Sequence, residues 1–443
     1  MKKNIFFVSA VVALCFFYTG SVYMAQYYRL MTFYDDVTID IITSVYNYIL
    51  QALGIAIYIY GFKKRYLLFS NNHFFVYSLI IGSIFMSIIL ITRNPIILQI
   101  FGYLFNLSIG INSAFYLTLF TEKCPEEKMG LFFGLSYALG SIGTYLLSLI
   151  DNGEYITSSK SIALYFLIIA LIIYFVLNSE NIKYKSRKNT KTQMPSSTKN
   201  LVLIIILMTT ISCIGSGLYY SLPQAQGINW YLIRAFYSIG LIIAGLIMDK
   251  NSFMGETCVV ASLTYPLIAT SLFNQGMTDT ITLSLSYIFR GFITIYYVLS
   301  FGKLYKKEND YLLFSSLGLL VSRLSEAIIT IVLMKLNISN IVQLIFSAIC
   351  FIPLLFVFVK TQNEKYVGTS FSETKRMALF CEKYELTNRE KEILELLVQG
   401  LSDLEISSKL FISNNTVRFH ISNLLKKTNS KSRIDVVNAL NKM

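Results

Sequence analysis

Near the carboxyl end of the chain, a short stretch places polar, charged and aromatic side chains on one side of an expected helix. Ser413 is suited to cap this helix, because its hydroxyl can accept a hydrogen bond from a backbone N–H of the first turn. Apolar residues recur at helical spacing from Val417 to Leu425 and would bury the opposite side. The exposed side then carries groups that suit the base edges and phosphates of a DNA major groove: Asn415, Arg418, Phe419, Ser422, Asn423 and Lys426.

A second set of chemically distinctive residues lies in long apolar stretches farther upstream. An arginine in hydrocarbon costs at least ~2.5 kcal/mol, so such a group usually faces a polar cavity or a partner. Glu326 lies three residues after Arg323 and can neutralise only that arginine. We hypothesise that Arg234 and Arg290 receive an anionic or electron-rich small molecule; the alternative is that they form structural pairs or reach water near helix ends. The expected ligand-binding residues are Arg234, Arg290, Arg323, Glu326, Asn106 and Asn112.

Two shorter helices are expected before the helix at Ser413, and each begins with a capping-box pattern. Thr387 with Glu390 begins the first, and Ser402 with Glu405 begins the second. The apolar stripes expected to be buried are Ile393, Leu394, Leu396 and Leu397 in the first helix and Leu404, Ile406 and Leu410 in the second. In a closing helix over about 433–442, the expected buried face is Ile434, Val437 and Leu440.

These residues resemble the LuxR-type helix-turn-helix domain over the whole four-helix module, 386–443. The matching segments are Leu386-Thr387-Asn388-Arg389-Glu390-Lys391-Glu392-Ile393-Leu394, Gly400-Leu401-Ser402, Glu405-Ile406, Ser413-Asn414-Asn415-Thr416-Val417-Arg418, His420-Ile421 and Lys431-Ser432-Arg433. The resemblance implies that the third helix enters the major groove with Arg418, Phe419 and Ser422 nearest the bases. It implies that Asn415, Thr416, Lys426 and Lys427 hold phosphates.

The same resemblance implies that the fourth helix pairs two copies on a two-fold promoter site, so that the DNA-bound form is a dimer. RNA polymerase is a further candidate partner. The alternative for this module is a helical protein-interaction domain. From Leu386 onward, nine Lys or Arg residues stand against six Asp or Glu, a weak electrostatic footprint for a DNA-binding domain. The acids lie mostly on the first two helices, however, and the bases follow the third.

The composition of the whole chain places most of it in lipid. Of its 443 residues, 54% are hydrophobic and 14% charged, with a mean hydropathy of +0.57, which is too apolar for an ordinary soluble protein. Apolar stretches that could cross a bilayer, at about 20 residues each, recur as far as residue 359. We expect twelve, near residues 5–26, 39–62, 74–92, 95–120, 129–150, 160–178, 200–222, 228–248, 256–273, 280–302, 311–334 and 340–359. The expected fold class is all-α: a twelve-helix transmembrane bundle followed by the four-helix domain.

The twelve stretches form two groups of six: a first half at 1–178 and a second half at 200–359. A polar, basic linker at 179–199 joins them and is expected to be flexible. Three local patterns resemble the major facilitator superfamily: Gly245 to Lys250 its G-x-x-x-D-(R/K) loop, Gly61 to Arg65 a reduced version without the acid, and Pro125 to Gly143 the glycine-rich start of its fifth helix. This resemblance implies a central cavity lined by the fourth, seventh and tenth helices, and the polar residues above fall on these helices or on the flanking eighth and eleventh.

Lysine and arginine are distributed unevenly between the two sides of the expected bundle. Seventeen lie on one side, and four, Arg29, Arg93, Lys160 and Lys335, lie on the other. Positive residues accumulate on the cytoplasmic side. We therefore expect a multi-pass protein of the bacterial cytoplasmic membrane with both termini in the cytoplasm, where a DNA-binding tail can reach the genome.

No pattern typical of an enzyme site occurs, and the six cysteines are scattered singly, so we expect no catalysis, disulfide, metal or other cofactor. We interpret the chain as a membrane-bound one-component transcription regulator with a transporter-like sensor at 1–359, a linker at 360–385 and a DNA-reading domain at 386–443. A small molecule of unknown identity would shift the sensor through its differential affinity for two conformations. The alternative is a secondary transporter with a regulatory DNA-binding tail, although the stretches lack an acidic proton-relay series.

Overall fold

All regular secondary structure is helical in the computed structural model, which describes residues 2–151, 156–183, 196–220, 230–265, 278–306, 314–336, 340–430 and 432–441. The chain forms two compact units, Met1–Phe358 and Val359–Met443. We call them the membrane unit and the C-terminal unit.

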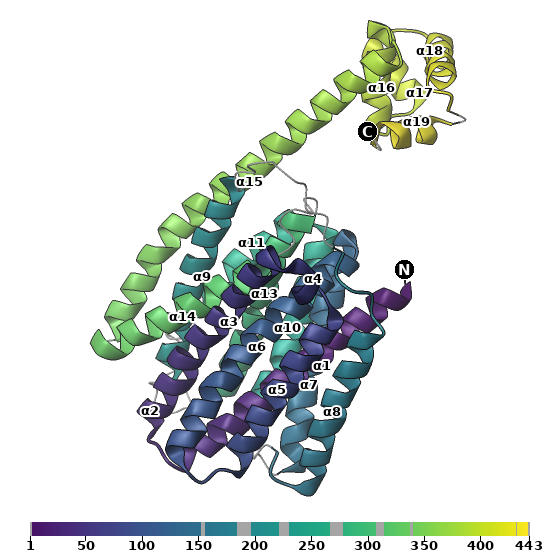
Figure 1. Ribbon diagram of the computed structural model, residues 1–443. Helices are drawn as coiled ribbons and strands as arrows, with labels where there is room; N and C mark the ends of the chain where they lie inside the picture. The colour runs from purple at the N-terminus through teal and green to yellow at the C-terminus, as the bar shows by residue number, and fades with distance from the viewer. Residues whose placement is uncertain are drawn as a thin grey trace. The chain divides into compact units, whose positions relative to one another are not determined.

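The membrane unit is a bundle of long helices (Figure 1). In the first half these are α1 (Lys2–Met31), α2 (Asp36–Asp40), a π-helix (Ile41–Tyr46), α3 (Asn47–Lys64), α4 (Tyr66–Phe69), α5 (Asn72–Ile91), α6 (Pro95–Lys123), a short 3-10 helix (Glu126–Lys128), α7 (Met129–Ile150) and α8 (Ser159–Leu177). In the second half they are α9 (Ser196–Tyr220), α10 (Trp230–Lys250), α11 (Ser252–Ser262), α13 (Thr278–Lys306), α14 (Leu317–Leu336) and α15 (Asn340–Lys383).

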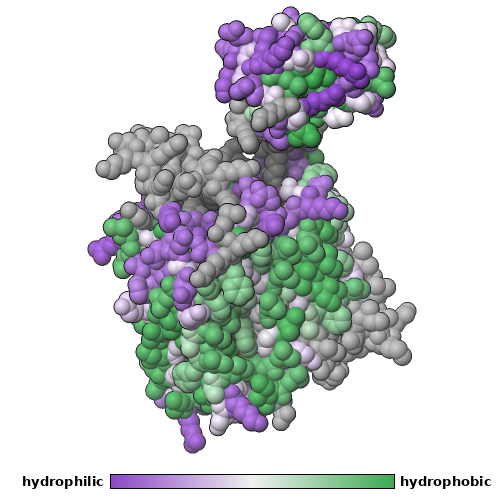
Figure 2. Space-filling view, turned by 90° about the vertical axis from the view of Figure 1, so that its right-hand side faces the viewer, coloured by the Kyte–Doolittle hydropathy of each residue, from purple (hydrophilic) through white to green (hydrophobic). Residues whose placement is uncertain are grey.

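Within the described residues, nine helices are long and apolar enough to cross a membrane. They correspond to the first six expected stretches and to the tenth, eleventh and twelfth. The other three, at 200–222, 228–248 and 256–273, each run into residues outside the described part. Figure 2 shows a band of hydrophobic surface on this unit, bordered by hydrophilic surface. Large apolar side chains such as Ile91 and Phe356 are exposed on this unit, as suits a surface that contacts lipid rather than water. The chain is a multi-pass membrane protein.

Helices of the two halves pack against each other as well as within each half. In the first half α3 packs on α6 and α1 on α7. Between the halves, α10 packs on α7 and α14 packs on α3. The contact between α7 and α10 is made at backbone distance, because a Cβ built on Gly130 would lie 2.3 Å from the carbonyl oxygen of Gly245. Any larger residue at either glycine would force these two helices apart.

The last helix of the membrane unit does not end where the apolar residues end. α15 contains 44 residues and includes the boundary between the two units. At 1.5 Å per residue such a helix is about 66 Å long, roughly twice the thickness of a hydrocarbon core. The expected linker at 360–385 is therefore helical as far as Lys383.

The C-terminal unit adds four short helices to the end of α15: α16 (Asn388–Val398), α17 (Asp403–Leu410), α18 (Asn414–Lys427) and α19 (Arg433–Asn441). The predicted capping boxes at Thr387 and Ser402 are both confirmed: each hydroxyl accepts from the backbone N–H three residues later, and each glutamate accepts from the backbone N–H of the capping residue. Ser413 caps α18 as predicted and accepts from the Thr416 backbone. Phe411 takes the left-handed conformation (φ 54°) that ends α17 and turns the chain into α18.

Most of the apolar residues that were predicted to be buried in the C-terminal unit contribute to its core, but two of them are exposed. Its buried residues are Phe380, Ile393, Leu394, Leu397, Ile406, Val417, Ile421, Leu424, Val436 and Leu440. Leu404 and Ile434 were predicted to be buried, but they are 68% and 71% exposed. Each stands two residues from the buried position of its helix, about 200° around the axis, and so faces away from the core. Phe380, in the stretch expected to be only a linker, closes the core from α15.

Candidate nucleic-acid interface and polar sites of the membrane unit

An acidic side chain fastens the two halves of the membrane unit together where α7 begins. The carboxylate of Asp249, at the end of α10, accepts hydrogen bonds from the backbone N–H groups of Gly130 (2.8 Å) and Leu131 (2.7 Å). These groups lie in the first turn of α7 and have no partner within their own helix, and the positive end of the helix dipole adds to the attraction. Lys303 of α13 forms an ion pair with the same carboxylate at 3.2 Å. Asp249 therefore holds together three helices of both halves; we call this group the Asp249 clasp.

A second contact between the halves involves the ionisable residues predicted as a ligand site. Arg323 pairs with Glu326 at 2.9 Å, which confirms the predicted pairing, and its guanidinium lies 4.3 Å from the ring centroid of Tyr48 in α3. Arg290 lies 6.0 Å from the ring centroid of Tyr287 in its own helix. Two of the predicted residues, Arg323 and Glu326, thus lie together, and Arg323 also contacts an aromatic side chain of the first half that was not predicted.

The remaining predicted ligand residues are placed differently. Asn106 belongs to a network of buried amides, accepting from Gln51 (2.8 Å) and donating to Gln26 (3.1 Å). Asn112 is buried farther along α6. The side chain of Arg234 lies outside the part of the chain whose side chains are described. Asn106 is thereby a packing element of the first half, and the binding roles of these three residues remain predictions.

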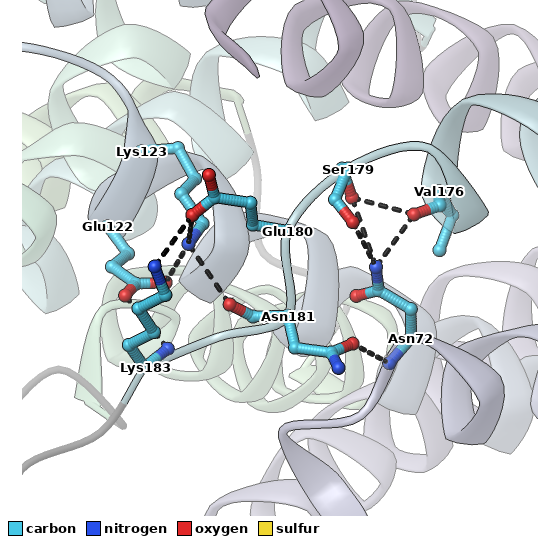
Figure 3. Close-up of polar contacts among 8 residues, drawn as sticks. All are labelled: Asn72, Glu122, Lys123, Val176, Ser179, Glu180, Asn181 and Lys183. Carbon is cyan, nitrogen blue, oxygen red and sulfur yellow. Dashed lines mark hydrogen bonds and ion pairs between the residues drawn. The ribbon is translucent and has the colours of Figure 1, made fainter. Parts of the chain in front are cut away.

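The start of the segment between the halves is fixed to the ends of α5 and α6 (Figure 3). Asn72 donates to the carbonyl oxygens of Val176 (2.7 Å) and Ser179 (2.8 Å), and its backbone N–H donates to Asn181. Lys183 donates from its backbone to Glu122, and its side chain pairs with Glu180.

The expectation of a flexible linker beginning at residue 179 is wrong for residues 179–183. These residues supply and receive the hydrogen bonds that the helix ends leave open, so they are held in place. The hydrogen bond and charge of Lys183 lower the pKa of Glu180 to about 2, so this pair stays ionised at any physiological pH. Residues 184–195 lie outside the described residues.

In the C-terminal unit, α18 presents a polar face opposite its buried one. The buried face consists of Val417, Ile421 and Leu424. Of the predicted DNA-contacting residues, Asn415, Arg418, Phe419, Ser422, Lys426 and Lys427 are exposed, while Thr416 and Asn423 are partly buried. Phe419 exposes 62% of its surface, although its ring lies 5.5 Å from that of the neighbouring His420. The predicted face therefore exists as a surface that a second molecule can reach.

Arg418 is attached to the neighbouring helix by an acid that the sequence analysis did not assign. Its Nε lies 3.4 Å from Oδ2 of Asp403, the first residue of α17. Arg433, at the start of α19, lies 2.6 Å from the other oxygen of the same carboxylate. Asp403 is 15 positions from Arg418 and 30 from Arg433, so no local sequence pattern could reveal this arrangement.

Lys427, predicted to hold a phosphate, makes contacts inside the unit. Its ammonium donates to Oε2 of Glu390 and to the carbonyl oxygen of Glu385, both at 2.8 Å. Burial raises the pKa of Glu390, but the hydrogen bonds from Lys427 and Thr387 outweigh it and lower this pKa below its usual value. Lys427 thus ties the end of α18 to the start of α16, and its phosphate contact remains a prediction.

Comparison with known proteins accounts for this arrangement of helices. Residues 384–440 match the family described as bacterial regulatory proteins, luxR family. The chain is 50% identical over 64 residues to the spore germination protein GerE of Bacillus subtilis, which covers 14% of this chain and 86% of GerE. The chain belongs to the LuxR family of bacterial regulatory proteins.

The LuxR match is confined to the C-terminal unit. The nitrate/nitrite response regulator NarP of Escherichia coli is 53% identical over 49 residues, 11% of this chain and 23% of NarP. The membrane unit is similar to a different class of protein, the fucose:proton symporter FucP of E. coli, with a TM-score of 0.55 and 14% identity over 81% of this chain and 98% of FucP. FucP in its outward conformation gives a TM-score of 0.56 at 13% identity. This LuxR-family chain therefore carries a bundle with the major facilitator fold.

Proposed function

We propose that the protein is a membrane-bound one-component transcription regulator that senses a small molecule through its transporter-like unit and binds promoter DNA through α18. The observation that carries this proposal is the presence of a LuxR module and a major facilitator bundle in one chain, with the helix α15 belonging to both. A helix of about 66 Å is stiffer than a loose tether and suits the transmission of a displacement.

The ligand acts by changing the relative stability of two arrangements of the halves. A small molecule shifts such an equilibrium only as far as its affinities for the two arrangements differ. The Asp249 clasp and the contact of Arg323 with Tyr48 are among the polar contacts that a rocking motion of the halves would break. The proposed ligand is anionic or electron-rich and is received by Arg234 and Arg290, with Arg323, Glu326, Asn106 and Asn112 around it.

The DNA-binding step uses the exposed face of α18. Arg418, Phe419 and Ser422 read base edges in the major groove, and Asn415, Thr416 and Lys426 contact phosphates. Two copies bind a two-fold promoter site, and RNA polymerase is the partner of the bound form. This arrangement requires both termini in the cytoplasm and the bundle in the bacterial cytoplasmic membrane, an orientation that the excess of basic residues on one side supports.

The experiment that tests this function is recovery of DNA with the full chain in lipid nanodiscs. Sheared genomic DNA from the source organism is bound at about 0.15 M salt, eluted and sequenced, with the Arg418→Ala variant in parallel. We expect a small set of promoter fragments to be enriched by the wild type and lost with the variant. Equal recovery of all fragments by both proteins would contradict promoter recognition.

A second candidate function is secondary transport with a regulatory DNA-binding tail. The likeness of the membrane unit to FucP, which is a fucose:proton symporter, favours it. Uptake into proteoliposomes distinguishes the two functions: a transporter accumulates a radiolabelled solute, whereas a pure sensor binds it without accumulation. Labelled monosaccharides and small organic acids are the first solutes to compare.

A further inference from the structure

The carboxylate of Asp403 lies between two guanidinium groups that come from different helices. It pairs with Arg433 of α19 at 2.6 Å and with Nε of Arg418 of α18 at 3.4 Å. The Asp403 side chain is only 11% exposed, whereas that of Arg418 is 67% exposed. The acid is thus part of the folded surface, and the arginine projects from it.

This pairing restricts an otherwise adaptable side chain. An arginine on a helix surface loses rotamer entropy when it is fixed on a partner. A contact through Nε limits that freedom before any partner arrives, and it leaves the two terminal amino groups unengaged by Asp403. Two parallel N–H donors match O6 and N7 of guanine, the commonest specific arginine contact in a major groove.

The second guanidinium makes the arrangement compatible with DNA. A lone carboxylate beside a reading arginine would repel the phosphate backbone. Because Arg433 already neutralises Asp403 and holds it at 2.6 Å, the group of three side chains keeps a net positive charge. Arg433 also fixes the position of the carboxylate, which would be needed for it to orient Arg418.

We propose that Asp403 is a positioning residue: it orients Arg418 toward a guanine of the operator and so sets the base preference at one position without itself contacting DNA. This inference rests on the proposed DNA-binding function. A merely structural role, in which the acid at the first position of α17 stabilises that helix, would affect all DNA sequences alike.

The test compares base preference with overall affinity. The full chain in lipid nanodiscs selects from a pool of duplexes with a randomised 20-bp core, and the bound fraction is sequenced. Affinity for one fixed duplex outside the selected set is measured in parallel. The variants are Arg418→Ala, Asp403→Ala and Glu395→Ala, the last being a matched loss of one negative charge on the exposed side of α16.

We expect the wild type to select a guanine at one position of each half-site and Arg418→Ala to lose this preference. Because exposed ion pairs are weak, Asp403→Ala should lower the preference by roughly two- to fivefold. Affinity for the fixed duplex should be unchanged or higher, since a negative charge is removed, and Glu395→Ala should keep the wild-type preference. Asp403→Ser, whose hydroxyl suits the start of a helix but cannot reach Arg418, should behave like Asp403→Ala and controls for folding.

Two results would overturn the inference while leaving the proposed function standing. One is an unchanged guanine preference in both Asp403 variants. The other is a uniform loss of affinity for all duplexes, including the fixed one. If the wild type selects no sequence at all, the proposed DNA-binding function fails, and this outcome is distinct from the first two.

Discussion

Removing the charge of Asp249 should open the contact between the halves of the membrane unit. The Asp249→Asn variant keeps the shape of the side chain but replaces one acceptor oxygen with a donor, which faces a backbone N–H of α7. Hydrogen bonds to charged groups contribute about 1.5–3 kcal/mol each, and the variant loses one of them outright, weakens the other and loses the pair with Lys303. A loss of about 2–4 kcal/mol shifts the ratio of clasped to open molecules by roughly 30- to 900-fold.

Pulsed electron paramagnetic resonance can measure this shift. Spin labels at Glu127→Cys and Asn251→Cys, in a background without the six native cysteines, report the distance between the start of α7 and the end of α10. We expect a single short distance in the wild type and an added longer one in Asp249→Asn. Asp36→Asn, an exposed acid with the same charge change, serves as the control. Identical distance distributions in all three proteins would refute the role assigned to the clasp.

Three further outcomes follow from the geometry. Arg418→Ala should weaken binding to the selected operator by about 1–3 kcal/mol and leave non-specific binding within a few-fold, as gel-shift titrations can check. Lys427→Ala leaves Glu390 without its cation and should destabilise the C-terminal unit by about 1–3 kcal/mol, as measured by thermal unfolding. If Lys427 only contacted a DNA phosphate, the unfolding temperature would not change. The pKa of Glu390 is lower in the folded unit than in the unfolded chain, so the carboxylate stabilises the fold at a pH above its unfolded pKa, and this stabilisation is lost as the pH falls through its folded pKa. The free energy of unfolding should therefore decrease below about pH 4.5 in the wild type, and it should decrease less in Glu390→Gln.

Local interactions were the part of the fold that the amino-acid sequence could predict. The caps at Thr387, Ser402 and Ser413 each join residues three positions apart, so the pattern contains both partners. The apolar stretches of the first half predicted α1, α3 and α5 to α8 for a similar reason, because length and hydropathy alone decide whether a helix can cross a bilayer. The pairing of Arg323 with Glu326 was likewise a matter of helical spacing.

Contacts between distant segments could not be predicted. The partners of Asp249 lie 119 and 118 positions away, and nothing in the sequence around Gly130 indicates that its backbone N–H will meet a carboxylate. Leu404 was predicted to be buried because it is apolar, but a residue two positions from the buried Ile406 lies on the opposite side of the helix. The segment 179–183 was predicted to be part of a flexible linker because it is mostly polar. Its polar groups instead form hydrogen bonds with the ends of distant helices, which the sequence does not indicate.

The central claim is that one chain spans the membrane and binds specific DNA, and chromatin immunoprecipitation from intact cells tests it most directly. The full chain, epitope-tagged at its C-terminal end and cross-linked in place, should recover a few promoter sites that disappear with Arg418→Ala while the tag stays inaccessible to antibody outside unbroken cells. Recovery of no DNA above background, or labelling of the tag from outside, would contradict the account.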